Sequence, residues 1–266
     1  GFPGFGWVLP PAAQDAMNFN PMAMWFDVLS RMFSPYQLNP MNFNPLAVVL
    51  GPLVDFERLR KASPIKLFVC ATNVRTGRAR VFRDHELRLE MLLASACLPF
   101  TFQAVRVSET RADGTEVHEH YWDGGYMGNP ALFPLGHATK TRDLLLVQIN
   151  PLVRPDVPNT SQEIVERANE ISFNASLMHE MRTLAFVQRM LKENRLDAKR
   201  YKQVLFHAIS AQECMRRLTA ASKYDTSRAF MRELFDLGRN TAVDWLDQKL
   251  SYVGHASSVN ISEMFL

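Results

Sequence analysis

Two nearly continuous apolar runs limit the folds open to this chain. Residues 65–71 read Ile-Lys-Leu-Phe-Val-Cys-Ala, and residues 144–149 read Leu-Leu-Leu-Val-Gln-Ile. Apolar runs of this length, without alternating polar residues, are typical of strands buried on both faces, and the second run is the better candidate for a parallel strand. Strands of this kind need helices over both faces of their sheet, so we predict an α/β fold.

The segments around these runs alternate between strand and helix patterns. Thr76-Gly77 turns the first run into a hairpin over residues 65–82, and a capping-box spacing from Thr160 to Glu163 starts a long helix. That helix keeps its apolar period to about residue 195, which is long for a globular helix, and we leave open a break near Phe173-Asn174. The remaining predicted elements are a helix over 86–96 stopped by Pro99, strands over 102–107, 117–122 and 203–209, and a helix over 227–250.

Residues 1–60 form a distinct segment rich in Pro, Met and Asn. The sequence Met-Asn-Phe-Asn-Pro occurs at 17–21 and again at 41–45. Because Asn is a good N-cap and Pro fits the first helical turn, each copy predicts a helix, over 22–33 and 45–50. The first helix is apolar almost all round, which suits a lid or acyl-contacting surface, or a helix packed against the domain, and we favour the packed helix. We treat 1–60 as a helical segment and 61–266 as one domain, because no linker divides the rest.

Composition excludes several classes of protein. The 266 residues carry a formal net charge of +3 with Lys and Arg spread along the chain, so no basic stripe indicates nucleic-acid binding. No run approaches the roughly 18 apolar residues of a membrane span. Cys70, Cys97 and Cys214 are far apart, each in apolar surroundings, which predicts reduced core thiols. These features favour a cytoplasmic protein.

The stretch Tyr-Trp-Asp-Gly-Gly-Tyr-Met-Gly-Asn-Pro at residues 121–130 carries the strongest chemical signal. It puts Asp123 at the end of a predicted strand, directly before Gly124 and Gly125, which allow a sharp turn and leave the carboxylate unshielded. A general base needs such a position. The alternative is an ordinary Asp-Gly turn that closes a hairpin.

A catalytic carboxylate needs a nucleophile to deprotonate, and the sequence offers poor candidates. No G-x-S-x-G motif occurs in the 266 residues. Ser95 is flanked by small residues near a helix end but does not lie on a strand-to-helix turn. Cys97 lies in an apolar helix, where a thiolate is disfavoured. We therefore assign no nucleophile within this chain.

His118, His120 and Asp123 are candidate ligands for a metal ion. On a strand the two histidines share one face, and a nearby carboxylate would complete a ligand set. Two histidines on the solvent face of a strand are the commoner arrangement. We predict neither a metal nor a cofactor.

The order of these blocks resembles the second half of a patatin-like phospholipase domain, in particular bacterial patatin-like proteins whose domain continues into a long C-terminal helix. The resemblance rests on Ala-Ser-Ala-Cys-Leu-Pro-Phe at 94–100, a strand pair, Asp-Gly-Gly at 123–125 and Asn129-Pro130, with a hairpin containing Ala-Thr-Asn at 71–73 ahead of them. It covers roughly residues 55–150. It implies a three-layer α/β/α fold with a mixed, largely parallel sheet.

The resemblance also implies an activity. In that family the aspartate of the Asp-Gly-Gly block is the base of a Ser-Asp dyad, a role that falls on Asp123, with Gly124, Gly125 and Asn129 supporting the turn. The family's glycine-rich oxyanion loop and G-x-S-x-G elbow are absent here, so we expect the chain to begin downstream of them, with the N-terminal part of the domain missing.

The expected function is hydrolysis of carboxylic esters of lipids, with peripheral contact at a membrane surface. This chain alone is expected to be inactive. The alternative is a non-catalytic relative that binds acyl chains or a partner protein through residues 17–50.

Overall fold

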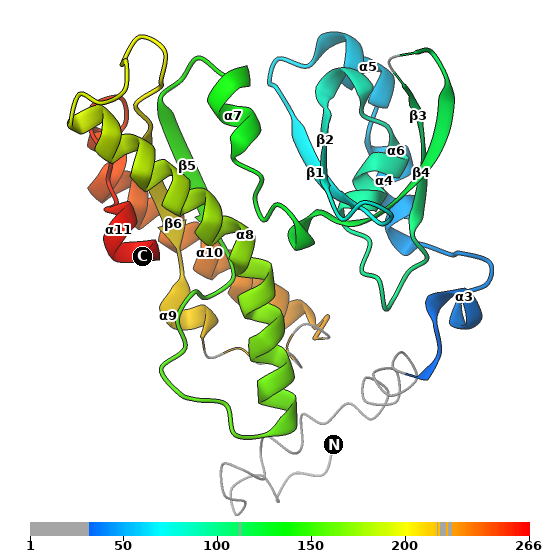
Figure 1. Cartoon of the computed structure of the whole chain (residues 1–266). Helices are drawn as coiled ribbons and strands as arrows, with labels where there is room; N and C mark the ends of the chain where they lie inside the picture. Colours follow the sequence, from blue (N-terminus) through cyan, green and yellow to red (C-terminus); the bar gives the residue numbers. More distant parts are fainter. Residues whose placement is uncertain (1–31, 112, 217, 219–221, 223–224) are drawn as a thin grey trace, which may run out of the picture.

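The computed structural model describes residues 32–266 except 112, 217, 219–221 and 223–224. It is a mixed α/β structure with two separate sheets, one antiparallel and one parallel. Figure 1 shows the two sheets side by side, joined by the segment that follows β4, with the long helix α8 running diagonally past that junction.

The described elements include strands and helices close to those that the sequence predicts, in the same order, together with further short helices that it does not predict. The strands are β1 (Phe68–Asn73), β2 (Ala79–Arg83), β3 (Val105–Thr110), β4 (Glu116–Asp123), β5 (Asp143–Gln148) and β6 (Leu205–Ser210). The α-helices are α3 (Pro35–Leu38), α4 (Pro45–Leu53), α5 (Phe56–Ala62), α6 (Leu89–Ser95), α7 (Phe133–Ala138), α8 (Ser161–Lys192), α9 (Gln212–Met215), α10 (Arg228–Lys249) and α11 (Ile261–Phe265). Short 3-10 helices are η2 (Asp84–Glu86), η3 (Gly124–Tyr126) and η5 (Leu250–Tyr252).

The first sheet has four antiparallel strands in the order β2-β1-β4-β3. The β1–β2 hairpin and the β3–β4 pair are as predicted, and β4 ends at Asp123. One face of the sheet packs on α6 through a core that contains Phe82, Met91, Val107 and Tyr121. This core fixes β1 and β4 at the centre of the sheet.

The second sheet pairs β5 and β6 in parallel, which confirms the prediction for residues 144–149. Leu146 and Phe206 lie in a core with side chains from α8 and α11. On the other face the ring of His207 on β6 meets Trp245 of α10. Helices thus cover β6 on both faces.

The expectation that both apolar runs are buried throughout is wrong in detail. In the first run, Ile65 is 63% exposed and the strand begins only at Phe68. In β5 the side chains alternate, because Leu146 is buried while Leu145 and Val147 are 47% and 65% exposed. The described strands form three antiparallel pairs and one parallel pair, so a largely parallel sheet and a three-layer arrangement are not confirmed.

Helix α8 begins at the predicted capping box. The Thr160 hydroxyl accepts from the Glu163 N–H, and the Glu163 carboxylate accepts from the Thr160 N–H. No break occurs near Phe173-Asn174, because α8 is continuous over Ser161–Lys192. Buried Asn174 donates its side-chain amide to the Pro151 carbonyl at 3.0 Å, so it stabilises a loop contact and does not compete with the helix backbone.

The N-terminal segment is described only in part. The predicted helix over 22–33 and the first copy of the repeat lie almost wholly outside the described residues. The second copy does cap a helix, because the Asn44 side chain accepts from the Leu46 N–H at the start of α4. Several apolar side chains here are exposed, among them Met41, Phe43 and Leu53 at 91%, 62% and 74%.

Candidate active site

The candidate site lies where the first sheet gives way to the second. Asp123 is the last residue of β4 and the N-cap of η3. Its backbone N–H donates to the Cys97 carbonyl at 2.9 Å, and its carbonyl accepts from the Thr72 hydroxyl at 2.8 Å. Hydrogen bonds to Cys97 and Thr72 therefore hold the backbone of Asp123 in place.

The Asp123 carboxylate is half-buried and held at one oxygen. Oδ1 accepts from the Gly125 N–H at 2.7 Å. Within the described part of the chain, Oδ2 has no hydrogen-bond partner. Burial raises the pKa of Asp123 above its ordinary value, and the Gly125 hydrogen bond opposes this change. A carboxylate with one oxygen fixed and a raised pKa is suited to accept a proton.

Gly124 and Gly125 are required by close packing on both sides of the turn. A Cβ atom on Gly124 would lie 2.1 Å from the carbonyl oxygen of Cys70 in β1. One on Gly125 would lie 2.5 Å from the ring of Phe173 in α8 and 2.9 Å from Asp123 Oδ1. The two glycines thus let the turn fit between β1 and α8.

Asn129 joins the turn to α8. Its backbone N–H donates to the Ser176 hydroxyl at 3.0 Å, and its side-chain amide donates to the Phe173 carbonyl at 3.4 Å. The peptide bond between Asn129 and Pro130 is cis. These contacts give Asn129 a structural role at the end of the Gly-Gly turn.

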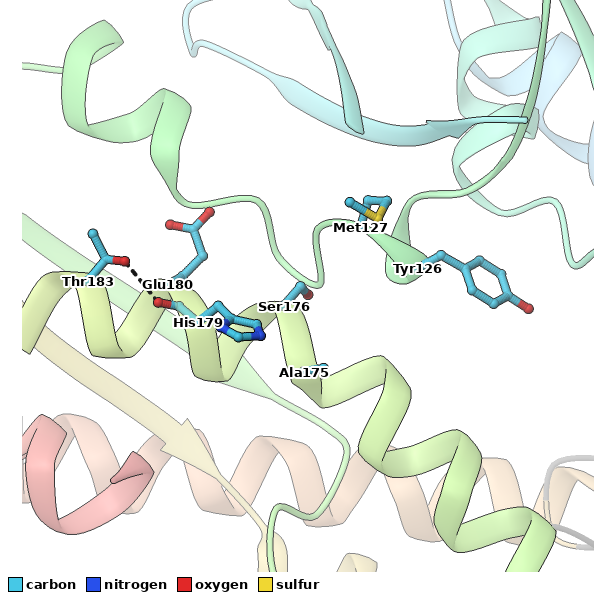
Figure 2. A pocket seen from close by; sticks show the side chains of 7 residues that line it. All are labelled: Tyr126, Met127, Ala175, Ser176, His179, Glu180 and Thr183. Atoms are coloured by element: carbon cyan, nitrogen blue, oxygen red, sulfur yellow. Dashed lines mark hydrogen bonds between the residues drawn. The ribbon is translucent and has the colours of Figure 1, made fainter. Parts of the chain in front are cut away.

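A pocket of about 370 Å³ opens between the turn and α8. Figure 2 shows that the turn contributes one wall and successive turns of α8 the other. The residues that line it are Tyr126, Met127, Ala175, Ser176, His179, Glu180 and Thr183. Burial and the negative charge of Asp123 both raise the pKa of Tyr126, which links this pocket electrostatically to the aspartate.

Glu180 gives the pocket a carboxylate with altered acidity. Burial raises its pKa, while the backbone N–H groups of Phe133 and Leu132 oppose the change. No functional residue is predicted from the sequence on this part of α8. The Ser-x-x-His-Glu spacing over 176–180 could have indicated a polar helix face, but its relation to Asp123 depends on tertiary packing.

The thiols near the turn are poorly suited to be nucleophiles. Burial and the charge of Asp123 raise the pKa of Cys70 to about 11. The pKa of Cys97 is also raised to about 11, chiefly by burial. All three cysteines are free, but Cys214 is exposed in α9, so the prediction of three core thiols is wrong for this residue.

Ser95 is the last residue of α6, and its hydroxyl donates to the Leu92 carbonyl at 2.9 Å. This is an ordinary contact within a helix end. Among the described hydrogen bonds it has none with Asp123, so the structure provides no base for its activation.

His118 and His120 project from β4 on the face opposite to Asp123, as the alternation of a strand requires. The His118 ring lies 3.0 Å from the Ser108 hydroxyl on the paired strand β3. In the described part of the chain, no three His, Cys, Asp or Glu side chains are grouped so as to hold a metal ion.

Comparison with known proteins supplies no family for this site. No family model, curated protein or solved structure matches the chain.

The sequence analysis missed a second group of polar side chains. His207 is 1% exposed, with Nε2 3.1 Å from Asp143 Oδ1 and Nδ1 3.0 Å from the Ser258 hydroxyl. Asp143 Oδ1 also accepts from the Gly254 N–H at 2.7 Å. These contacts fasten the C-terminal segment to β5 and β6. The partners lie 51 to 111 residues apart, and no local pattern relates them.

Among the helices that the structure describes, none has the length and apolar character needed to cross a membrane.

Proposed function

We propose that this chain is part of a patatin-like lipid acyl hydrolase and that Asp123 is the base of its Ser-Asp dyad. The observation that carries the proposal is the state of the Asp123 carboxylate, which is half-buried, anchored at Oδ1 by Gly125 and open at Oδ2. The Asp-Gly-Gly turn and the helices on both sides of β6 agree with a patatin-like three-layer fold.

In the proposed reaction, a serine from outside residues 1–266 attacks the carbonyl carbon of a lipid ester. Asp123 accepts the proton of the serine hydroxyl as the new C–O bond forms. Backbone N–H groups, also supplied from outside these residues, stabilise the oxyanion. When the tetrahedral intermediate collapses, the proton passes from Asp123 to the leaving alcohol, and water repeats the cycle on the acyl-enzyme. No histidine is needed.

The pocket beside the turn suits part of the substrate. Its α8 wall carries hydroxyl, imidazole and carboxylate groups, whereas Met127 and Tyr126 offer apolar area. This mixture fits the polar part of a lipid near the ester and not the length of an acyl chain.

The test uses the longest natural protein that contains this chain. We expect a fluorophosphonate probe to label it and a short acyl ester to be hydrolysed. Asp123→Asn should lower kcat by about 10²- to 10⁴-fold, since the general base is lost. Asp113→Asn is the matched control, because Asp113 lies in the exposed β3–β4 turn. The Asp113→Asn protein should keep its normal activity.

Asp123→Asn protein that retained most of its turnover would show that Asp123 is not the base. The 266-residue chain alone is expected to hydrolyse nothing. Turnover by that chain, lost on Ser95→Ala, would instead assign the nucleophile to Ser95.

One observation favours a second candidate function. The exposed Met41, Phe43 and Leu53 side chains form part of an uncharged stretch over 32–54, which suits a non-catalytic protein that binds acyl chains or a partner. On this alternative the complete protein binds a fluorescent fatty acid but is not labelled by the fluorophosphonate probe. Labelling and turnover together would exclude it.

A further inference from the structure

A second pocket, of about 390 Å³, lies at the carboxyl end of β6, away from Asp123. It is lined in part by Ser210 at the end of the strand, by Cys214 and Arg216 around α9, and by Leu237 and Thr241 of α10. The carboxyl ends of parallel strands are where open α/β sheets commonly bind ligands. The position alone suggests a site, and its polar atoms indicate what kind.

Two side-chain polar atoms of this pocket are buried without a hydrogen-bond partner. They are Ser210 Oγ and Arg216 Nε. Gln148, the last residue of β5, is paired in register with Ser210 of β6, and its side-chain oxygen Oε1 is also buried without a partner. Unpartnered buried polar atoms are uncommon and costly, because each loses its contacts with water. Two of these atoms lie at the carboxyl ends of β5 and β6 and the third just after α9, and together they indicate that a ligand completes their hydrogen bonds.

The guanidinium group of Arg216 is arranged to receive an oxyanion. Nη1 donates to Glu213 Oε1 at 2.9 Å. This leaves the other edge of the group, formed by the N–H groups of Nε and Nη2, without a partner in the described part of the chain. That edge is the planar fork that binds a carboxylate or phosphate through two parallel hydrogen bonds.

Arg216 is also held in position by a charged network. Its carbonyl accepts from Arg154 Nη1 at 2.5 Å. Arg154 in turn forms a two-point ion pair with Glu170 of α8, at 2.5 and 3.2 Å, and Arg167 binds the same carboxylate. The backbone that carries the fork is therefore fixed before any ligand binds, which lowers the entropy cost of binding.

We propose that this pocket binds a small molecule that carries an oxyanion, either a carboxylate or a phosphate, on the Nε–Nη2 edge of Arg216. The Ser210 hydroxyl donates a further hydrogen bond, and Leu237 contacts the apolar part of the molecule. The site is independent of Asp123 and of the proposed hydrolase activity.

The exposed thiol of Cys214 allows a direct test, because it lines the pocket whereas Cys70 and Cys97 do not. Neutral iodoacetamide reports occupancy through the rate of Cys214 alkylation, read by peptide mass spectrometry. Inorganic phosphate and hexanoate are the two probes, and they distinguish the two oxyanions. We expect at least one to slow the alkylation with a Kd of about 1 mM or lower.

Three variants of the full chain assign the effect. Arg216→Lys keeps the charge but loses the fork, so protection should weaken about tenfold or more, and Ser210→Ala should weaken it less. Arg232→Gln is the matched control, because this exposed arginine of α10 pairs with Asp236 outside the pocket, and protection should be unchanged. Calorimetric titration of each variant gives an independent affinity.

The proposal is overturned if neither probe protects Cys214. It is also overturned if Arg216→Lys protein that retains the normal thermal unfolding curve is protected as well as the parent, or if Arg232→Gln abolishes protection. Weaker protection in both variants, with the larger effect in Arg216→Lys, and unchanged protection in Arg232→Gln support it.

Discussion

Gly124→Ala tests whether the Asp123 turn is fixed by backbone contact with β1. The added Cβ would lie 2.1 Å from the oxygen and 2.6 Å from the carbon of the Cys70 carbonyl, whereas carbon atoms prefer contacts of about 3.5 Å. The obstacle belongs to the main chain of a strand that is hydrogen-bonded on both sides, so it cannot rotate away. Overpacking costs about 1–3 kcal/mol where side chains can adjust. We expect a loss of about 3 kcal/mol here.

The measurement is urea unfolding followed by circular dichroism. Gly238→Ala is the matched control, because Gly238 lies within α10 and a Cβ there would meet nothing within 4 Å. The control should gain about 0.5–1 kcal/mol, the usual advantage of Ala over Gly inside a helix. A Gly124→Ala protein as stable as the parent would refute the argument, since the turn could then move away from β1 at no cost.

Three further predictions concern ionisable groups. Burial raises the pKa of Asp123 in the folded chain, so the free energy of unfolding should fall as pH rises from the unfolded pKa, near 4, toward the higher folded pKa. Asp123→Asn removes this loss of stability and should raise the Tm at pH 7. A lower Tm would contradict the prediction. For Asp143 the effect of pH on stability is the opposite, because the Gly254 N–H and His207 lower its pKa in the folded chain. The stabilisation from the ionised carboxylate is complete above about pH 4 and is lost as pH falls through the lowered folded pKa. Asp143→Asn should therefore lower the Tm at pH 7 and flatten the decline of the Tm in acid, and a parallel decline in both proteins would disprove this role of Asp143. At pH 8 the Cys70 and Cys97 thiols, each with a pKa of about 11, are ionised in about one molecule in a thousand. Iodoacetamide should therefore modify the exposed Cys214 well before either of them. Equal rates of modification would show that the turn opens readily.

Local signals in the sequence were sufficient for much of the fold. Asn44 before Pro45, and Thr160 three residues before Glu163, mark helix starts that the structure confirms. The Thr76-Gly77 turn correctly predicts the β1–β2 hairpin. In each case the deciding contact joins residues within a few positions of each other, so the sequence contains the whole interaction.

The errors arose where a distant partner decides the outcome. Asn174 does not break α8 because its amide bonds to Pro151, 23 residues away. The Cys214 error is of another kind, because its neighbours Gln212, Glu213 and Arg216 are polar and already favour the exposure that the structure shows. For the candidate site, the sequence could place Asp123 at the end of a strand before a turn. It could not show that Phe173 closes over Gly125, since α8 is brought there by the packing of the second sheet.

The continuity of α8 has a consequence for how the molecule opens. Glu170, which binds Arg154, and Phe173, which covers Gly125, lie three residues apart on one unbroken helix, a rise of about 4.5 Å along its axis. The helix cannot fray at one of these contacts and stay intact at the other. In amide hydrogen exchange, the N–H groups of this part of α8 and that of Gly125 should therefore become exposed in the same opening event, as parts of one cooperative unit.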